Sequence, residues 1–132
     1  KYVLSLIKTN KITCIGGESY IYGLIKNCSY NYYTNSEKLF IEAEYNTNFS
    51  ANLINYNNIY DIYCYNTVII NLSKLNINLL KLIKSKYIII INCHHKDFWK
   101  KIRFLNKYKL IKRHKFIANN HFITVNLFVK SY

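Results

Sequence analysis

The sequence predicts a single α/β domain built on a doubly wound, Rossmann-like and mainly parallel sheet. Tyr87–Asn92 contains four consecutive isoleucines without polar alternation, which is typical of an interior parallel strand with both faces buried. Apolar and polar stretches alternate along the rest of the chain, as they do where strands alternate with helices. The length of 132 residues suits one hydrophobic core, so we treat residues 1–132 as one reduced domain.

The first half of the chain predicts short helices and two extended segments. Gly16 and Gly17 end the first buried strand, and Leu39, Phe40 and Ala43 lie on one face of the third helix. The expected elements are the end of a helix over Val3–Ile7, a strand over Lys11–Ile15, a helix over Tyr20–Asn27, an extended Ser29–Thr34, a helix over Glu37–Tyr45 and a loop over Asn46–Asn58.

The second half predicts the central strand and a basic segment. Val68–Ile70 either extends the preceding strand or opens the next connection, and Phe122–Val129 is either a last strand or the start of a terminal helix. The other expected elements are a strand over Ile59–Tyr65, a helix over Leu72–Ser85, a basic amphipathic segment over Phe98–Lys109 and a short strand at Phe116–Ile117. We expect Lys11–Ile15 and Asp61–Tyr65 to flank the isoleucine strand.

The strongest physical signal is positive charge. The chain has 19 Lys and Arg against 6 Asp and Glu, a net charge of +13, and such a field favours a polyanionic partner. A basic insert at about residues 96–115 carries nine of these side chains among aromatic residues that can stack on bases. The residues predicted to bind RNA are Lys96, Lys100, Lys101, Arg103, Lys107, Lys109, Lys112, Arg113 and Lys115. The alternative to RNA binding is that these side chains form a solvated helix face.

The composition indicates an extremely A+T-rich gene. Lys, Asn, Ile, Tyr and Phe dominate, Pro is absent, and only Arg103 and Arg113 are arginines. Organelle genomes commonly have this bias, so we predict an organellar protein of the ribosome or, less favoured by the charge, of a respiratory complex. The longest apolar run is far below the roughly 20 residues that span a bilayer, so no membrane partner is expected.

No pattern in the sequence predicts catalysis, a metal or a cofactor. The loop after the first strand, Gly16-Gly17-Glu18, lacks the GxGxxG pattern, and Tyr32–Asn35 offers no acid to bind a ribose. Cys93-His94-His95 lacks the spacing of a zinc site. The sequence therefore favours a protein that is not an enzyme, and a degenerate S-adenosylmethionine-dependent RNA methyltransferase is the alternative.

Four cysteines are spaced too widely for a CxxC pair. Cys14, Cys64 and Cys93 lie in or beside apolar runs, whereas Cys28 does not. We interpret the cysteines as buried free thiols.

Several segments, taken in order, resemble the universal small-subunit ribosomal protein two family. Lys11–Gly17 resembles its first strand, Thr47–Phe49 the end of a loop, Tyr60-Asp61 the start of a strand, and Phe116–Ile123 its closing motif. The protruding helical hairpin of the family has no room here, and Asn120 and His121 replace the acids of the closing motif.

The resemblance implies a structural constituent of the mitochondrial small ribosomal subunit. Its expected partners are small-subunit rRNA and neighbouring ribosomal proteins, and it is not expected to be a homo-oligomer.

Overall fold

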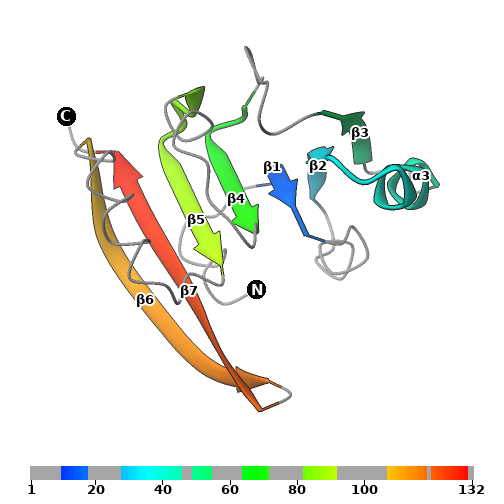
Figure 1. The fold of residues 1–132 in the computed structure, drawn as a ribbon. Coiled ribbons are helices and arrows are strands. Elements are labelled where there is room, and N and C mark those ends of the chain that lie inside the picture. The colour runs from blue at the N-terminus through cyan, green and yellow to red at the C-terminus, as the bar shows by residue number, and fades with distance from the viewer. Residues whose placement is uncertain are drawn as a thin grey trace.

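The computed structural model contains a seven-stranded sheet and one helix among the residues that it describes (Figure 1). It describes residues 10–17, 28–45, 49–54, 64–71, 82–91, 107–118 and 120–130. The elements are β1 (Lys11–Gly16), β2 (Ser29–Thr34), α3 (Glu37–Glu44), β3 (Phe49–Leu53), β4 (Thr67–Asn71), β5 (Tyr87–Ile91), β6 (Tyr108–Ala118) and β7 (His121–Lys130). The strand order is β3-β2-β1-β4-β5-β7-β6. This confirms the Rossmann-like, mainly parallel fold.

Five strands, β3 through β5 in the spatial order, are mutually parallel. β5 is an interior strand, as its isoleucines predicted, but its neighbours are β4 and the antiparallel β7. The expected neighbours, Lys11–Ile15 and Asp61–Tyr65, are therefore wrong. β1 lies one strand further away, and Cys64 and Tyr65 lie outside the strands. The parallel neighbour of β5 is Thr67–Asn71, where four successive side chains are buried.

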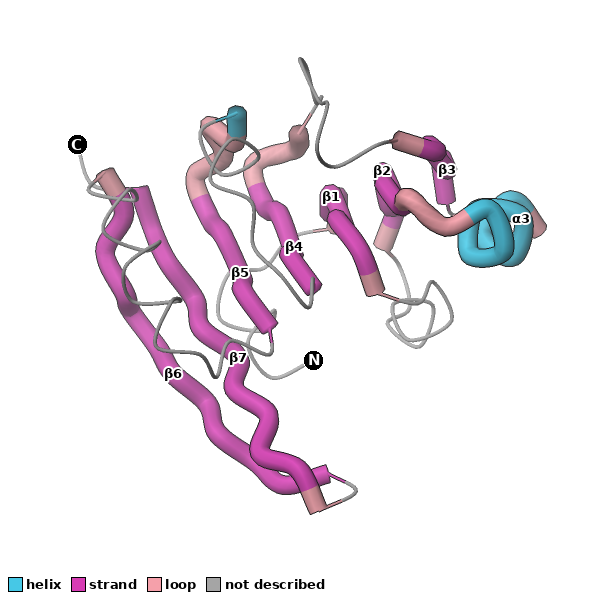
Figure 2. The backbone as a smooth tube through the Cα atoms, viewed as in Figure 1, coloured by secondary structure: helices cyan, strands magenta, loops and turns pink. Residues whose placement is uncertain are grey.

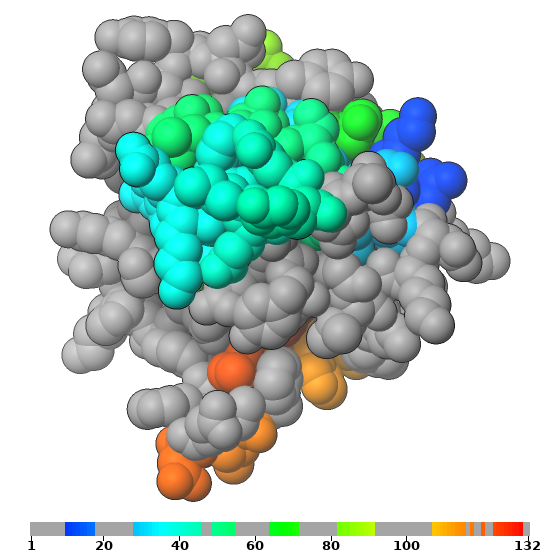
Figure 3. Space-filling view, turned by 90° about the vertical axis from the view of Figure 1, so that its right-hand side faces the viewer, coloured from blue at the N-terminus to red at the C-terminus, as the bar shows by residue number. Residues whose placement is uncertain are grey.

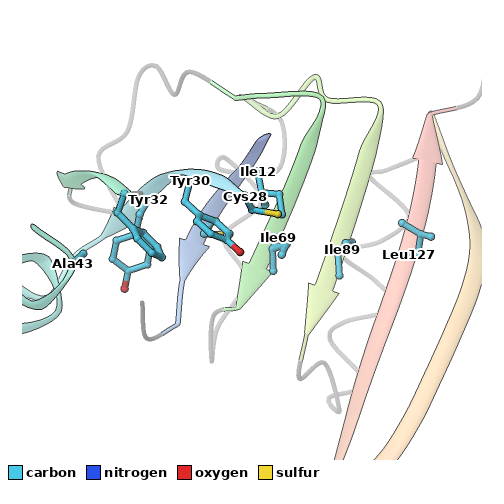
Figure 4. Close-up of a cluster of buried hydrophobic side chains, with 10 residues drawn as sticks. Ile12, Cys28, Tyr30, Tyr32, Ala43, Ile69, Ile89 and Leu127 are labelled. Atoms are coloured by element: carbon cyan, nitrogen blue, oxygen red, sulfur yellow. The ribbon is translucent and has the colours of Figure 1, made fainter. Parts of the chain in front are cut away.

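The core lies on both faces of the sheet. Successive isoleucines of β5 alternate between two buried clusters, with Ile88 and Ile90 in one and Ile89 in the other. Phe128 and Leu127 of β7 continue the two clusters, and Figure 4 shows Ile89 and Leu127 on one face of the sheet. We call the cluster with Ile90 the first face and the cluster with Ile89 the second face.

The helix α3 packs at the β3 edge of the sheet. Ser36 caps it, because the Ser36 hydroxyl accepts a hydrogen bond from the Leu39 N–H at 3.3 Å. Ala43 is fully buried on the second face, where the rings of Tyr30 and Phe49 stack with centroids 4.7 Å apart. The predicted helix is confirmed.

The predicted loop over Asn46–Asn58 is wrong in part, because it contains β3. This segment, Phe-Ser-Ala-Asn-Leu, has no apolar run because an edge strand has only one neighbour. Its pairing with β2 adds a bond from the Asn52 amide to Asn31 Oδ1 at 3.0 Å.

The last two strands form a long antiparallel hairpin (Figure 2). Phe122–Val129 is a strand rather than a helix, and the predicted short strand at Phe116–Ile117 is the end of an 11-residue strand. Residues 108–115 of the predicted basic insert belong to β6, an edge strand of the sheet whose register shifts between Leu110 and Lys112. Lys109, Lys112, Arg113 and Lys115 conceal the strand pattern, because an edge strand carries charged side chains where an interior strand carries apolar ones.

Other predicted elements lie outside the described residues. These are Val3–Ile7, Tyr20–Asn27, residues 59–63, residues 72–81 and residues 92–106. Within the part of the chain that the structure describes, Cys14 and Cys28 are buried free thiols and Cys64 is a half-buried one. No helix among the described residues is long and apolar enough to cross a membrane.

Candidate cofactor-binding edge

The strand order reverses direction between β1 and β4. The chain proceeds outward from β1 to β2 and β3, and then returns to the other side of β1 to form β4. In open α/β sheets, ligands bind outside the carboxyl ends of the strands at such a switch point. The residues that end β1, β2 and β4 are therefore the candidate site.

Two glycines form the end of β1. Gly16 has φ 78° and Gly17 has φ 74°, so both occupy the left-handed region that disfavours a Cβ atom. The Tyr32 hydroxyl donates a hydrogen bond to the Gly17 carbonyl, which fixes the turn against β2. Together, the two glycines let a ligand approach the backbone at a place that a side chain would otherwise fill.

The end of β2 is polar but uncharged. Thr34 is buried, and its hydroxyl accepts a hydrogen bond from the Ser36 N–H at 3.2 Å. Asn35 follows and is exposed. Its amide offers one neutral acceptor oxygen, where a carboxylate would offer a ribose two charged ones. A nucleoside cofactor at the glycine turn would therefore meet a neutral group, and not an acid, at the end of β2.

Asn71 ends β4 and was not identified from the sequence. It pairs in register with Gly16, so its half-buried side chain is beside the glycine turn at the switch point. The signal was available in the sequence, because a polar residue directly follows the apolar Val68–Ile70. It was missed because those residues were not assigned to a strand of their own.

Most of the predicted RNA-binding residues that the structure describes lie on β6. Lys109, Lys112, Arg113 and Lys115 are exposed there, and Lys107 is exposed in the preceding turn. The other four, Lys96, Lys100, Lys101 and Arg103, lie outside the described residues, as do Cys93, His94 and His95. The basic residues of β6 are therefore separate from the glycine turn and belong to the opposite half of the sheet.

Burial perturbs two ionisable groups beneath the site. Burial raises the pKa of the Cys14 thiol well above its usual range, with a smaller effect from Cys28. Burial also raises the pKa of the Tyr30 hydroxyl, and Cys28 and Cys14 add to that rise. Both groups are consequently protonated and neutral near pH 7, so they serve packing rather than acid–base chemistry.

No protein-family model and no curated protein matches this sequence. Solved structures do match, and those described here define a Rossmann-like methyltransferase fold. Magnesium protoporphyrin IX methyltransferase (ChlM) from Synechocystis PCC 6803, with bound S-adenosylhomocysteine, matches with a TM-score of 0.72 and 14% identity over 98% of this chain and 80% of that chain.

Two tRNA methyltransferases are also similar. TrmK from B. subtilis, an M1A22 tRNA methyltransferase, matches with a TM-score of 0.68 and 14% identity over 98% of this chain and 64% of that chain. TrmK from M. capricolum, in complex with S-adenosylhomocysteine, matches with a TM-score of 0.67 and 15% identity over 100% of this chain and 70% of that chain. At these identities the likeness establishes the fold.

These matches correct one functional prediction. The expectation that the chain is not an enzyme is wrong, because the fold that it shares with the matched structures is in each of them that of a methyltransferase. They favour the alternative methyltransferase reading over a structural role in the ribosome. The resemblance to the ribosomal protein two family, the mitochondrial location and the ribosomal partners stay predictions.

Proposed function

We propose that this chain binds S-adenosylmethionine and acts as an RNA methyltransferase. The observation that carries the proposal is the pair of left-handed glycines at the carboxyl end of β1, at the switch point of a methyltransferase-like sheet. S-adenosylmethionine supplies an electrophilic methyl group when it is bound. The chain must hold the nucleoside, orient the substrate and exclude competing acceptors.

Residues at the ends of β1, β2 and β4 would each perform one of these tasks. Gly16 and Gly17 allow the cofactor to lie against the backbone, since neither carries a side chain that would occupy the space. Asn35 accepts a ribose hydroxyl, and Asn71 offers both an amide donor and an amide acceptor to the substrate. The neutral Asn35 predicts weaker cofactor binding than an acid would give, because hydrogen bonds to charged groups are stronger.

RNA is the substrate class that the charge favours. A net charge of +13 attracts a polyanion, and it is too large for a protein whose only ligand is a small neutral molecule. Similarity of the fold to two tRNA methyltransferases supports the same class.

Calorimetry with S-adenosylhomocysteine tests cofactor binding directly. We expect saturable binding by the full chain. Gly17→Val should lose at least about tenfold in affinity, because the valine side chain fills the space beside the glycine turn. Lys84→Gln is the control, because Lys84 is exposed in the segment that precedes β5, at the opposite edge of the sheet. Absence of saturable binding by a folded wild-type chain would refute the proposal.

A gain-of-function variant keeps the proposal testable if Gly17→Val does not fold. Asn35→Asp places a carboxylate at the end of β2 and should tighten S-adenosylhomocysteine binding by about fivefold, the difference between a neutral and a charged hydrogen bond. Asn35 is exposed, so the change leaves the core intact. An unchanged affinity would mean that the ribose does not bind at Asn35.

A second candidate function is rRNA binding in a mitochondrial small ribosomal subunit. The A+T-biased composition and the net charge of +13 favour it. Co-sedimentation of the tagged chain with small subunits, resistant to a high-salt wash, is the expected result. Release from the subunits at moderate salt would count against a structural role.

A further inference from the structure

The β6–β7 hairpin extends beyond the strand on which it packs. β5 pairs only with Val125–Val129, whereas β6 and β7 pair with each other as far as Ala118 and His121. Four residues of each strand therefore continue past β5, a length of about 13 Å at the usual rise per residue. We call residues 112–124 the arm, which consists of this extension and the adjoining residues 112–114 of β6, and Figure 1 shows the end of the hairpin projecting beyond the tip of β5.

The arm projects at the same edge as the candidate cofactor site. β7 is antiparallel to β5, so the start of β7 lies at the carboxyl end of β5. β1, β4 and β5 are parallel, so Gly16 and Asn71 lie at that same edge. A long polymer that bound along the arm would therefore reach the edge where β1 and β4 end. Figure 3 shows the orange β6 and β7 residues protruding at this end of the molecule.

The hairpin is fastened at its other end. The Tyr108 hydroxyl donates to the Ser85 carbonyl, and the Ser85 hydroxyl donates in turn to the Tyr65 carbonyl. The Lys130 N–H donates to the Lys86 carbonyl at 2.9 Å. These bonds join β6 and β7 to the segments that precede β4 and β5, so the arm extends from a fixed base.

Both faces of the arm are basic. Residues paired across two strands share a face, so Arg113 and Lys115 lie on the first face, opposite Asn126 and Thr124. Lys112 and His114 lie on the second face, opposite Leu127 and Val125. The chain contains no Asp or Glu after Asp97, so the arm and β7 contain no acidic side chain.

One arginine is held in place by a buried amide. Arg113 Nε donates to Asn126 Oδ1 at 2.8 Å, and Asn126 is 1% exposed in the middle of β7. Among the described residues, Asn126 Nδ2 has no hydrogen-bond partner, so burial of the amide carries a desolvation penalty. A guanidinium fixed through Nε loses less side-chain entropy when it binds a phosphate.

We propose that the arm is the docking element for the RNA substrate and that it binds the phosphate backbone. This inference rests on the proposed methyltransferase function, and it adds where the substrate binds. A second copy of the chain is a poorer occupant, because pairing β6 with another β6 would place lysines opposite lysines. A polyanion satisfies both basic faces at once, and phosphate contacts need no particular base sequence.

The test compares two triple variants of the full chain that lose the same charge. The arm variant is Lys112→Gln, Arg113→Gln and Lys115→Gln, and the control is Lys11→Gln, Lys38→Gln and Lys84→Gln, at exposed positions away from the arm. Binding of a fluorescent RNA hairpin of about 20 nucleotides is measured by anisotropy across a range of KCl concentrations. Three lost phosphate contacts should lower the salt slope by about two to three units and weaken binding roughly 10- to 100-fold at low salt. The control should weaken binding less than about threefold. Equal losses in the two variants would overturn the proposal.

Two further measurements separate the possible failures. The arm variant should bind S-adenosylhomocysteine with unchanged affinity, because the arm is separate from the glycine turn. A wild-type chain that binds RNA through the arm but not S-adenosylhomocysteine would refute the methyltransferase function while retaining the docking surface. Poly-L-glutamate that binds the arm as tightly as RNA would assign the surface to an acidic protein and overturn the proposal.

Asn126→Leu isolates the positioning role of the buried amide. The variant keeps every charge, so the salt slope should stay unchanged while RNA affinity falls about threefold through the lost orientation of Arg113. Asn126→Gln should restore part of the affinity, which a purely structural effect would not do. Wild-type affinity in a folded Asn126→Leu variant would show that Asn126 does not position Arg113 for RNA.

Discussion

β5 and β6 are strands of the same sheet, and they serve opposite purposes. β5 has five residues, and its three central isoleucines are at most 2% exposed. β6 has 11 residues, and Lys109 through Lys115 are exposed along it. β5 stabilises the sheet by burying apolar surface on both faces, whereas β6 places charged side chains on the surface of the sheet. The buried core and the exposed charge are therefore located in different strands, and each can be altered separately.

The largest expected effect is on the interior strand. Ile90→Ala removes a fully buried side chain from the first face, where Ile70 and Phe128 belong to the same cluster. We expect the free energy of unfolding to fall by about 2–5 kcal/mol, since the cavity adds to the lost transfer energy. Urea denaturation followed by circular dichroism measures it. A loss below about 1 kcal/mol would mean that β5 is not the centre of the core.

Alkaline pH should weaken the packing of the second face, to which Cys14 and Tyr30 belong. The pKa values of Cys14 and Tyr30 are raised mainly by burial, so the folded chain keeps protons that the unfolded chain releases above about pH 8.5. The unfolded state then binds fewer protons, and the free energy of unfolding falls as pH rises. The contribution is fully present below that pH.

The measurement is a series of urea denaturations between about pH 7 and pH 10. Cys14→Ala removes one of the two groups, so its free energy of unfolding should decline less steeply with pH than that of the wild type. Identical slopes for the two proteins would show that the Cys14 thiol does not titrate differently in the folded chain.

A smaller effect is expected at the edge of the parallel half. Ser36→Ala removes the acceptor of the Leu39 N–H at the start of α3 and should cost about 1 kcal/mol. Ser36→Asp keeps an acceptor at the cap and serves as the control, with stability near that of the wild type. Equal loss in both variants would indicate a packing effect rather than a capping effect.

The comparison also explains which parts of the fold the sequence could predict. The isoleucine strand and α3 were predicted because their signals are local, namely an unbroken apolar run and the apolar helical face of Leu39, Phe40 and Ala43. β3, β4 and β6 were missed or misassigned. A polar edge strand such as Phe49–Leu53 has no apolar run, and the partner of a strand depends on pairings that are distant in sequence.

The candidate site, like the fold, was predicted only in part from the sequence. Gly16-Gly17 was identified as the loop where a cofactor would bind, and it was set aside because the usual fingerprint was missing. The positive φ values of the two glycines make this loop a candidate cofactor site again, and φ values cannot be read from the sequence. Asn71 could be assigned to the candidate site only from its pairing with Gly16.

The smallest expected effect on stability is in the arm, and it makes a matched pair with Ile90→Ala. Ile117 is an isoleucine in a strand of the same sheet, but it is 66% exposed and lies where β6 has passed beyond β5. Ile117→Ala opens no cavity and buries no polar group, so the free energy of unfolding should change by less than about 0.5 kcal/mol. Urea denaturation of the two single variants and of the double variant gives the three values. The sites share no neighbouring side chain in the core clusters, so the effects should add. A loss for Ile117→Ala that approaches the loss for Ile90→Ala would mean that the end of the arm is covered by another part of the chain, and the arm would then not be open to RNA.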